Sequence, residues 1–305
     1  MNENKKVAIL MSTYNGEKYI EEQIESILKQ ENVYVDLYIR DDGSTDTTEI
    51  LLDKYSDKSN IHIEYGENVG FQRSFMNLVK NVPECYDYYA FSDQDDYWKP
   101  DKLIQAIMKL ERDSSCDLYT SALEVVNDEL EHQYFNDFTH LKISFGSAIS
   151  RQRLAGCTMV FSNKILHLAK SFPIDDYYNI FSHDAVVYYL TLLTGSGVFY
   201  DKNSYIKFRR HAGTVTEHGQ GLIKRIRSVT SIFSKDKSWK YRQVEALLSN
   251  YEDFMKEDIR KYCLKILEYK QSFFNTIRLI ADSRIRCGIL VVDFVNAIAI
   301  LFKCY

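Results

Sequence analysis

The sequence predicts an α/β fold with a mostly parallel sheet, helices on both of its faces, and a helical extension at the C-terminus. Short apolar runs typical of buried strands alternate with segments of helical periodicity through the first part of the chain, which is the pattern of a parallel sheet. Beyond about residue 220 the chain becomes basic and helical in character. We therefore expect an α/β domain over residues 1–220 and a basic helical region over residues 221–305, with an uncertainty of several residues at the boundary.

The first half of the α/β domain, residues 1–115, consists of strand and helix pairs. The expected strands are residues 7–11, 35–39, 61–65 and 88–92. The expected helices are residues 19–28, 46–55, 75–79 and 100–110. Asp46 with Glu49 resembles a capped helix start, and Pro100 is a residue that favours the first turn of a helix. This half should carry the ligand-binding edge of the sheet.

The second half, residues 116–220, has a looser pattern. We expect strands at residues 118–122 and 158–161, a helical or buried run at 186–193, and an apolar run at 205–208. No element is predicted in the polar, aromatic stretch that ends near residue 146.

Composition places the chain among globular proteins, with 45% hydrophobic and 27% charged residues and a net charge of −5. Six scattered cysteines without a Cys-x-x-Cys pair favour reduced thiols over disulfides or zinc. The N-terminal apolar run is too short for a secretion signal, so we expect a cytoplasmic location. Residues 222–305 hold 16 Lys and Arg against 9 Asp and Glu, so the rest of the chain is strongly acidic, which argues against a nucleic-acid partner.

Polar clusters follow three of the predicted strands. They are Ser12-Thr13-Tyr14-Asn15, Asp41-Asp42-Gly43-Ser44 and Asp93-Gln94-Asp95-Asp96. Ligands of parallel α/β sheets bind at the carboxyl ends of the strands, so the clusters predict one composite site. There is no G-x-G-x-x-G after the first strand and no G-x-x-x-x-G-K-[ST], so neither a dinucleotide fold nor a P-loop is supported.

The third cluster is a candidate metal site. In an extended segment Asp93 and Asp95 point the same way while Gln94 faces elsewhere, so the two carboxylates can converge on one cation. Hard oxygen ligands suit Mg²⁺ or Mn²⁺. The alternative is a solvated acidic loop that caps the following helix, and the cluster alone does not decide between the two.

Several segments resemble, in order and spacing, the motifs of family 2 glycosyltransferases with the Rossmann-like GT-A fold. They are Met-Ser-Thr-Tyr-Asn-Gly at 11–16, Arg-Asp-Asp-Gly-Ser at 40–44, Asn-Val-Gly at 68–70, Asp-Gln-Asp-Asp-Tyr-Trp at 93–98, His-Asp at 183–184 and Arg-Arg-His at 209–211. The resemblance covers roughly residues 5–215. It is greatest to the bacterial rhamnosyltransferase-like branch, which builds cell-surface polysaccharides.

The resemblance implies a nucleoside diphosphate sugar donor bound by the first three motifs. Ser12 and Asp42 would hold the base, with Thr13, Tyr14 and Asn15 in the same loop. A carboxylate can accept the imide N–H that uracil and thymine share, so uridine or thymidine diphosphate fits. Asn68 and Gly70 would form a turn close to the nucleotide. The alternatives are a strand end satisfied by Ser12, a helix cap at Asp42, and a turn at 68–70 that is only structural.

The resemblance also implies the chemistry. Asp95 would be the direct ligand of Mn²⁺ or Mg²⁺, with Asp93 on the ribose or on the metal through water. Asp184 would be the catalytic base of an inverting transfer, although it could also act as the N-cap of the run that follows. His211 and Arg210 would add a metal contact and a diphosphate contact, and Asp96 is not assigned a role.

The basic C-terminal region indicates a surface partner. Leu222, Ile223, Ile226, Val229 and Phe233 recur at helical spacing among cations, which is typical of a helix on an anionic membrane. Residues 288–302 are apolar but too short to predict a membrane span, and fit an interfacial helix, a monotopic anchor or a homodimer contact. Packing on the rest of the protein remains an alternative use of both segments.

The sequence thus predicts a metal-dependent inverting glycosyltransferase that moves a sugar, L-rhamnose being one candidate, onto a glycan or lipid-linked glycan acceptor at the inner face of the cell membrane. Two alternatives remain. One is a sugar nucleotidyltransferase, although the Gly-rich loop with a basic residue that this class carries after the first strand is missing. The other is a non-catalytic scaffold that binds a sugar nucleotide or a membrane.

Overall fold

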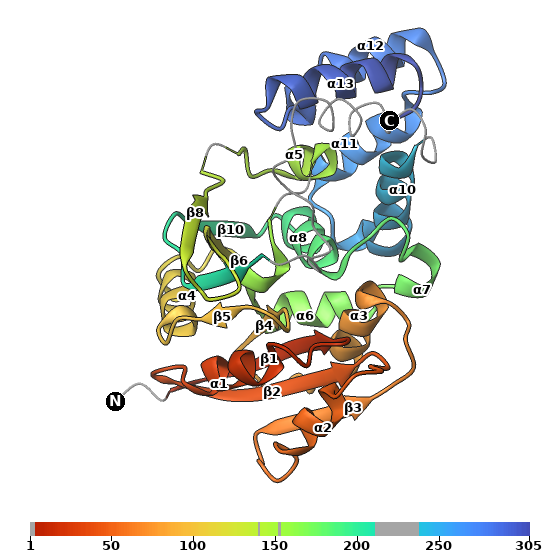
Figure 1. Cartoon of the computed structure of the whole chain (residues 1–305). Helices are drawn as coiled ribbons and strands as arrows, with labels where there is room; N and C mark the ends of the chain where they lie inside the picture. Colours follow the sequence, from red (N-terminus) through yellow and green to blue (C-terminus); the bar gives the residue numbers. More distant parts are fainter. Residues whose placement is uncertain (1–3, 140, 152–153, 211–237) are drawn as a thin grey trace. The chain divides into compact units, whose positions relative to one another are not determined.

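A computed structural model describes residues 4–139, 141–151, 154–210 and 238–305 (Figure 1). The described chain divides into two compact units. The first contains residues 4–139, 154–191 and 196–210, and the second contains residues 141–151, 192–195 and 238–305. The expected boundary near residue 220 and the apolar stripe at 222–233 lie outside the described residues, so both remain predictions.

The first unit is built on a seven-stranded sheet with the order β10-β6-β9-β4-β1-β2-β3. Its strands are β1 (Lys5–Thr13), β2 (Val33–Asp41), β3 (Ile61–Tyr65), β4 (Tyr88–Ser92), β6 (Cys116–Ser121), β9 (Val160–Ser162) and β10 (Gly197–Asp201). The pairs of β1 with β2, β1 with β4, β2 with β3 and β6 with β10 are parallel, and only β9 runs antiparallel to its neighbours in this sheet as described. The predicted mostly parallel sheet is confirmed.

Helices flank the sheet of the first unit (Figure 1). They are α1 (Ile20–Leu28), α2 (Thr48–Asp53), α3 (Phe71–Asn81), α4 (Lys102–Arg112), α6 (Asn163–Lys170), α7 (Ile174–Tyr177) and α8 (His183–Leu193), whose last two residues belong to the second unit.

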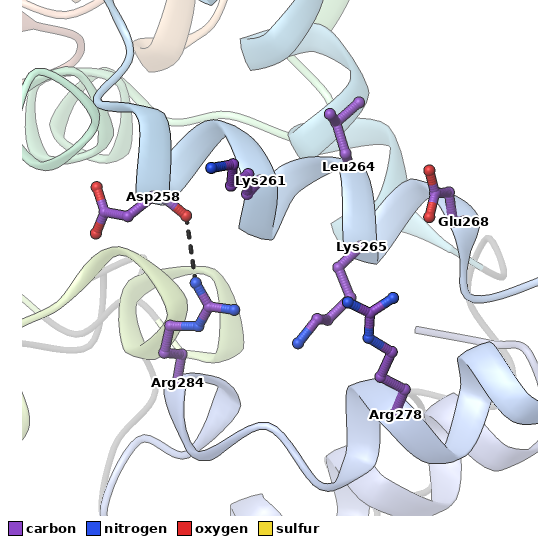
Figure 2. Close-up of a pocket in the computed structure, with 7 residues that line it drawn as sticks. All are labelled: Asp258, Lys261, Leu264, Lys265, Glu268, Arg278 and Arg284. Carbon is purple, nitrogen blue, oxygen red and sulfur yellow. Dashed lines mark hydrogen bonds between the residues drawn. The ribbon is translucent and has the colours of Figure 1, made fainter.

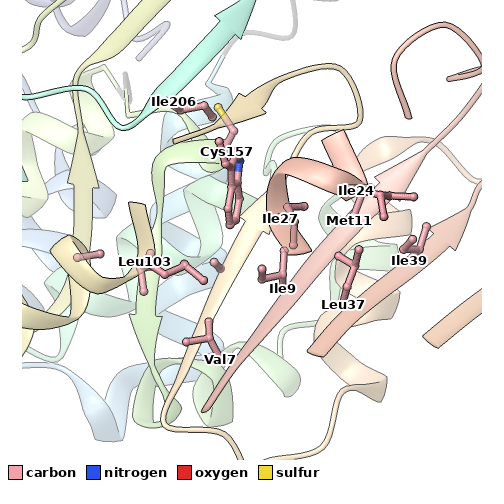
Figure 3. Packing of buried hydrophobic residues seen from close by; sticks show 14 of the residues in the cluster. Val7, Ile9, Met11, Ile24, Ile27, Leu37, Ile39, Leu103, Cys157 and Ile206 are labelled. Atoms are coloured by element: carbon pink, nitrogen blue, oxygen red, sulfur yellow. The ribbon is translucent and has the colours of Figure 1, made fainter. Parts of the chain in front are cut away.

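Alternation along the strands divides the core between the two faces of the sheet. Val7, Ile9 and Met11 point to one face and share a buried cluster with apolar residues of α1 and α4 (Figure 3). Phe91 points to the other face and meets Phe75 of α3 edge to face, with ring centroids 5.6 Å apart. Both faces are therefore covered, as the continuous apolar runs predict.

The first unit also contains a smaller sheet, in which neighbouring strands lie in the order β5-β11-β7-β8. Its strands are β5 (Tyr97–Trp98), β11 (Ile206–Arg209), β7 (Leu123–Val126) and β8 (His132–Asn136). The strands β7 and β8 fall in the stretch for which the sequence predicts no element. Most of β8 is exposed, so its sequence has no apolar alternation to reveal it.

The second unit is helical. It contains α5 (Phe145–Ser150), α10 (Trp239–Tyr251), α11 (Glu257–Glu268), α12 (Phe273–Ile280) and α13 (Leu290–Leu301), with short 3-10 turns η3 (Glu252–Phe254) and η4 (Ser283–Ile285). The predicted helical C-terminal region is confirmed over its described residues. None of the described helices combines the length and apolar character needed to cross a membrane.

Candidate active site

The loops after β1, β2 and β4 lie at the same edge of the central sheet. Thr13 at the end of β1 pairs with Asp41 at the end of β2, and Met11 pairs with Ser92 at the end of β4. The three polar clusters found in the sequence therefore follow neighbouring strands, β2, β1 and β4, at their carboxyl ends. This is the edge at which parallel α/β sheets bind ligands.

Gln94 joins the acidic turn to the loop after β1. Its Oε1 accepts from Thr13 Oγ1 at 2.5 Å and from the Tyr14 backbone N–H at 2.8 Å, and its Nε2 donates to the Tyr14 carbonyl at 3.2 Å. The sequence predicts only that Gln94 faces away from the metal ligands, so this contact is not expected from it. No local signal reveals it, because its partners Thr13 and Tyr14 lie 81 and 80 residues away along the chain.

The loop after β1 is also bonded to the loop after β2. The Asn15 backbone N–H donates to Ser44 Oγ at 2.8 Å, and Asn15 Oδ1 accepts from the Thr45 N–H at 2.8 Å. Asn15 itself has a φ of 50°, a conformation that asparagine tolerates better than most residues. The two loops thus form one braced unit, from which the ring of Tyr14 projects with 45% of its surface exposed.

Asp42 holds the turn at residues 68–70. Its carboxylate is buried and accepts from the N–H groups of Val69 at 3.0 Å and Gly70 at 2.9 Å, and it forms an ion pair with buried Arg40. Gly70 has a φ of 86°, which favours glycine at this position. The predicted base-binding residue therefore also shapes the predicted nucleotide turn, whose Asn68 is exposed. Asp41 closes the loop by accepting from the Ser44 N–H at 2.8 Å, which is not a helix cap because α2 begins only at Thr48.

Ser12 belongs to the same network. Its hydroxyl donates to Ser74 Oγ at 2.7 Å, and Arg40 donates to that same oxygen at 3.1 Å. The candidate base-binding residues Ser12 and Asp42 are thus connected through Arg40 and Ser74.

The acidic segment is a turn rather than an extended strand end. The prediction that Asp93 and Asp95 point the same way because the segment is extended therefore does not apply. Both side chains are partly exposed. Asp96 is fully buried, and within the described residues ligand atoms of Asp93, Asp96 and Cys157 lie within 4.8 Å of one another. Cys157 comes from a distant part of the sequence, which is why the sequence gives no hint of it.

Burial and nearby negative charges raise the pKa of two carboxyl groups in the turn, Asp93 and Asp96. Burial raises the pKa of Asp93, and the nearby charges of Asp95 and Asp184 raise it further. Burial likewise raises the pKa of Asp96, with Asp95 and Asp93 as further causes. Burial also raises the pKa of the Cys157 thiol well above its usual range.

The carboxylate oxygen atoms of the turn are suitable ligands for a divalent cation. Three carboxylates crowd there, and Asp96 Oδ2 is buried without a hydrogen-bond partner among the described residues. A cation would lower the repulsion that raises these pKa values. The donor set is thus consistent with Mg²⁺ or Mn²⁺.

Lys102 is a buried cation near this cluster that the sequence analysis does not identify. Its Nζ lies 3.6 Å from the centre of the Trp98 ring and has no hydrogen-bond partner among the described residues. Burial lowers its pKa from 10.5 to about 7, while the nearby Asp96 opposes that shift.

Arg209 fixes the turn from the smaller sheet. Its backbone N–H donates to Asp96 Oδ1 at 3.1 Å and its Nε donates to the Asp95 carbonyl at 3.0 Å. The guanidinium is buried, pairs with Glu22, and lies over the Tyr19 ring. Arg209 is therefore not part of an exposed basic turn. Arg210 is partly exposed and its N–H donates to the Val126 carbonyl, whereas His211 lies outside the described residues.

Asp184 lies in the first turn of α8. Its Oδ1 accepts from the Ala185 N–H at 2.8 Å and from the Ser182 hydroxyl. The donor is the N–H of the very next residue, so this is not the bond of an N-cap, which accepts from an N–H two or three residues further on. The charge of Asp184 is one of the causes of the raised pKa of Asp93.

His183 precedes Asp184 and is buried in an aromatic cluster. Its ring stacks on Phe75 with centroids 3.8 Å apart and meets Phe91 edge to face at 4.6 Å. Burial lowers its pKa to about 4, so the imidazole is neutral, and neither ring nitrogen has a hydrogen-bond partner in the described part of the chain.

Comparisons with known proteins agree with this geometry. The family model described as glycosyl transferase family 2 matches residues 8–167, which contain all three loops of the sheet edge. The chain is 32% identical over 216 residues to the dTDP-rhamnosyl transferase RfbG of Shigella flexneri, which covers 66% of this chain and 71% of that protein. It is 33% identical over 118 residues to the abequosyltransferase RfbV of Salmonella typhimurium, covering 37% of this chain and 34% of RfbV.

Solved structures show the same fold. TarS residues 1–349 of S. aureus, in complex with UDP-GlcNAc, superimpose with a TM-score of 0.54 at 15% identity, covering 98% of this chain and 91% of that chain.

Proposed function

Because the chain belongs to glycosyl transferase family 2, we propose that it is an inverting, metal-dependent glycosyltransferase that moves a sugar from a nucleoside diphosphate donor to a growing cell-surface polysaccharide. One observation supports the proposal most: Asp184 lies against Gly156, at which an added Cβ would be 3.1 Å from the Asp184 Cβ, and the next residue, Cys157, has its sulfur within 4.8 Å of ligand atoms of Asp93 and Asp96. A base and a group of donor-side carboxylates thus share one site.

The donor nucleotide binds along the loops after β1, β2 and β3 in this proposal. Asp42 and Ser12 recognise the base, Thr13, Tyr14 and Asn15 line its loop, and Asn68 and Gly70 form the turn beside it. Asp42 can still accept a base N–H, because a carboxylate offers about four lone-pair sites and three donors contact it here.

The acidic turn faces the diphosphate. Asp95 and Asp93 would hold Mg²⁺ or Mn²⁺, with His211 as a further ligand and Arg210 as a diphosphate contact. When bound, the cation offsets the negative charge that grows on the leaving diphosphate. Hydrogen bonds keep the turn in place: Arg209 of the smaller sheet donates to Asp95 and Asp96, and Gln94 accepts from the loop after β1.

Asp184 takes the proton from the acceptor hydroxyl as that oxygen attacks the anomeric carbon from the face opposite the diphosphate. The hydrogen bonds from Ala185 and Ser182 orient the carboxylate. Attack from that face inverts the anomeric configuration.

We propose thymidine diphosphate L-rhamnose as the donor and a glycan or lipid-linked glycan as the acceptor. The identity to a dTDP-rhamnosyl transferase supports the sugar and the nucleotide, and a UDP-sugar complex of a protein with this fold supports the class of donor. With such an acceptor, we propose that the protein acts at the inner face of the cell membrane and contacts the membrane through residues 221–305. Family membership leaves the nucleotidyltransferase and scaffold alternatives without support.

The test is a screen of nucleotide sugars for metal-dependent release of nucleoside diphosphate by the purified protein. Thymidine diphosphate rhamnose should be hydrolysed or transferred fastest, and only with Mn²⁺ or Mg²⁺ present. Equal turnover in a chelator would refute the metal requirement, and preference for another nucleotide sugar would refute the donor assignment.

A further inference from the structure

The second unit carries a large exposed apolar surface on two helices that pack against each other, α12 and α13 (Figure 1). Its side chains are between 44% and 85% exposed. We define the α12–α13 face by its main members, Phe273, Phe274, Ile277, Leu290, Phe294 and Phe302. Monomeric soluble proteins rarely gather so many large exposed apolar side chains on two packed helices unless they bind something.

The apolar character of α13 extends around the helix. Leu290, Phe294 and Leu301 recur at helical spacing on the exposed side, while Val295 and Ala299 are buried on the other. The buried side packs α13 within the unit, whereas the exposed side chains face away from the described residues.

Charges around the face favour an anionic partner. Arg278, Arg286 and Lys303 are exposed. The two acids of this segment are engaged inward: Asp282 pairs with Lys265 and Arg284, and the Asp293 carboxylate accepts from the Cys287 N–H at 2.7 Å. The face is thus apolar with a cationic border.

A pocket of about 400 Å³ opens beside α12, between α11 and η4 (Figure 2). Its lining carries four cations and two acids: Lys261, Lys265, Arg278, Arg284, Asp258 and Glu268. Lys261 pairs with Glu257, and Lys265 and Arg284 pair with Asp282. Arg278 forms no hydrogen bond or ion pair with the described residues, so it is the lining cation best placed to take an added anion.

We propose that the α12–α13 face docks on an anionic lipid bilayer, with its phenylalanines at the boundary of headgroups and acyl chains and Arg278 on a lipid phosphate. Interfacial helices use this combination of an apolar face and flanking cations. A second copy of the chain fits less well, because a self-complementary contact through this face would bring the same cations together. The inference does not depend on the reaction proposed above.

The experiment is vesicle flotation of the full chain, with residues 211–237 unchanged in every variant. Wild type should float with vesicles of phosphatidylcholine and phosphatidylglycerol and bind vesicles of phosphatidylcholine alone more weakly. The double variant Phe273→Ser, Phe294→Ser should lose at least about tenfold in affinity for both vesicles, because burial of each ring is lost. Arg278→Gln should lose about fivefold on the anionic vesicles only.

Phe254→Ser is the matched control, because Phe254 is 55% exposed in the same unit but lies on η3 and not on the face. It should bind like wild type. The proposal is overturned if wild type fails to float with the anionic vesicles, or if the double variant floats as well as wild type. A concentration-dependent dimer in light scattering that the double variant abolishes, without vesicle binding, would assign the face to a second copy instead.

Discussion

Gly156 lies directly against His183 and Asp184, the first two residues of α8. A Cβ added at Gly156 would come within 2.8 Å of His183 Nε2 and within 3.1 Å of the Asp184 Cβ. The absence of a side chain at position 156 therefore lets the candidate base and its neighbour keep their places. Gly156 also begins the turn that carries Cys157, which connects this contact to the acidic turn.

Gly156→Ala should reduce transfer by about 10²-fold, because a shift of the base by even an ångström impairs a reaction that depends on its position. Donor affinity, measured by calorimetry, should change little. The double variant Gly156→Ala, His183→Ala should recover part of the lost rate, because the imidazole that the new methyl group meets is gone. An unchanged rate in Gly156→Ala would show that Asp184 does not act from this position.

Asp184→Asn should lower transfer by about 10²- to 10⁴-fold, which is the range of general base catalysis. The amide keeps the shape of the side chain, so donor binding should persist. Transfer and donor affinity are measured on the same preparation, with exposed Asp176→Asn as a matched control in the same unit. Full transfer activity in Asp184→Asn would remove Asp184 from the mechanism.

Asp95→Asn should lower metal-dependent donor hydrolysis by at least about 10²-fold, since removal of one preorganised contact to developing charge costs that much. Asp113→Asn, an exposed acid after α4, should behave as wild type. Treatment of wild type with a chelator should abolish hydrolysis, and added Mn²⁺ should restore it. If Asp95→Asn retains the wild-type response to Mn²⁺, Asp95 is not the direct ligand.

The order of strands and helices could be predicted because each depends on local periodicity. The buried runs in β1 and β4 and the apolar spacing in α1 and α4 identify these elements without any knowledge of their partners. The exposed strand β8 lacks such a signal.

The details of the site depend on contacts between distant segments. That residues 93–96 form a turn, that Gln94 binds the loop after β1, and that Cys157 meets Asp93 follow from packing and not from local pattern. Which of the two neighbouring arginines is buried also depends on packing. Arg209 is buried by the smaller sheet and Arg210 is not, although the two residues are identical in type.

The stability of the second unit should depend on pH through Lys240. This side chain is buried on α10, donates to the Ser150 carbonyl at 2.7 Å and to Asn296 Oδ1 at 2.6 Å, and lies over the Tyr305 ring. Burial lowers its pKa from 10.5 to about 7, while the nearby charges of Cys287 and Arg151 have opposite effects. Between these pH values the unfolded chain binds the proton and the folded unit does not.

Stability should therefore rise with pH from about 7 toward 10.5, by up to about 1.4 kcal/mol per pH unit, and should not vary through this group below pH 7. The protein has two tryptophans, so in a Trp98→Phe background the fluorescence of Trp239 reports urea unfolding of the second unit. Lys240→Met should remove this rise, whereas Lys261→Met, at an exposed site on α11, should keep it. A Lys240→Met unit whose stability still rises with the same slope would show that another group titrates on unfolding.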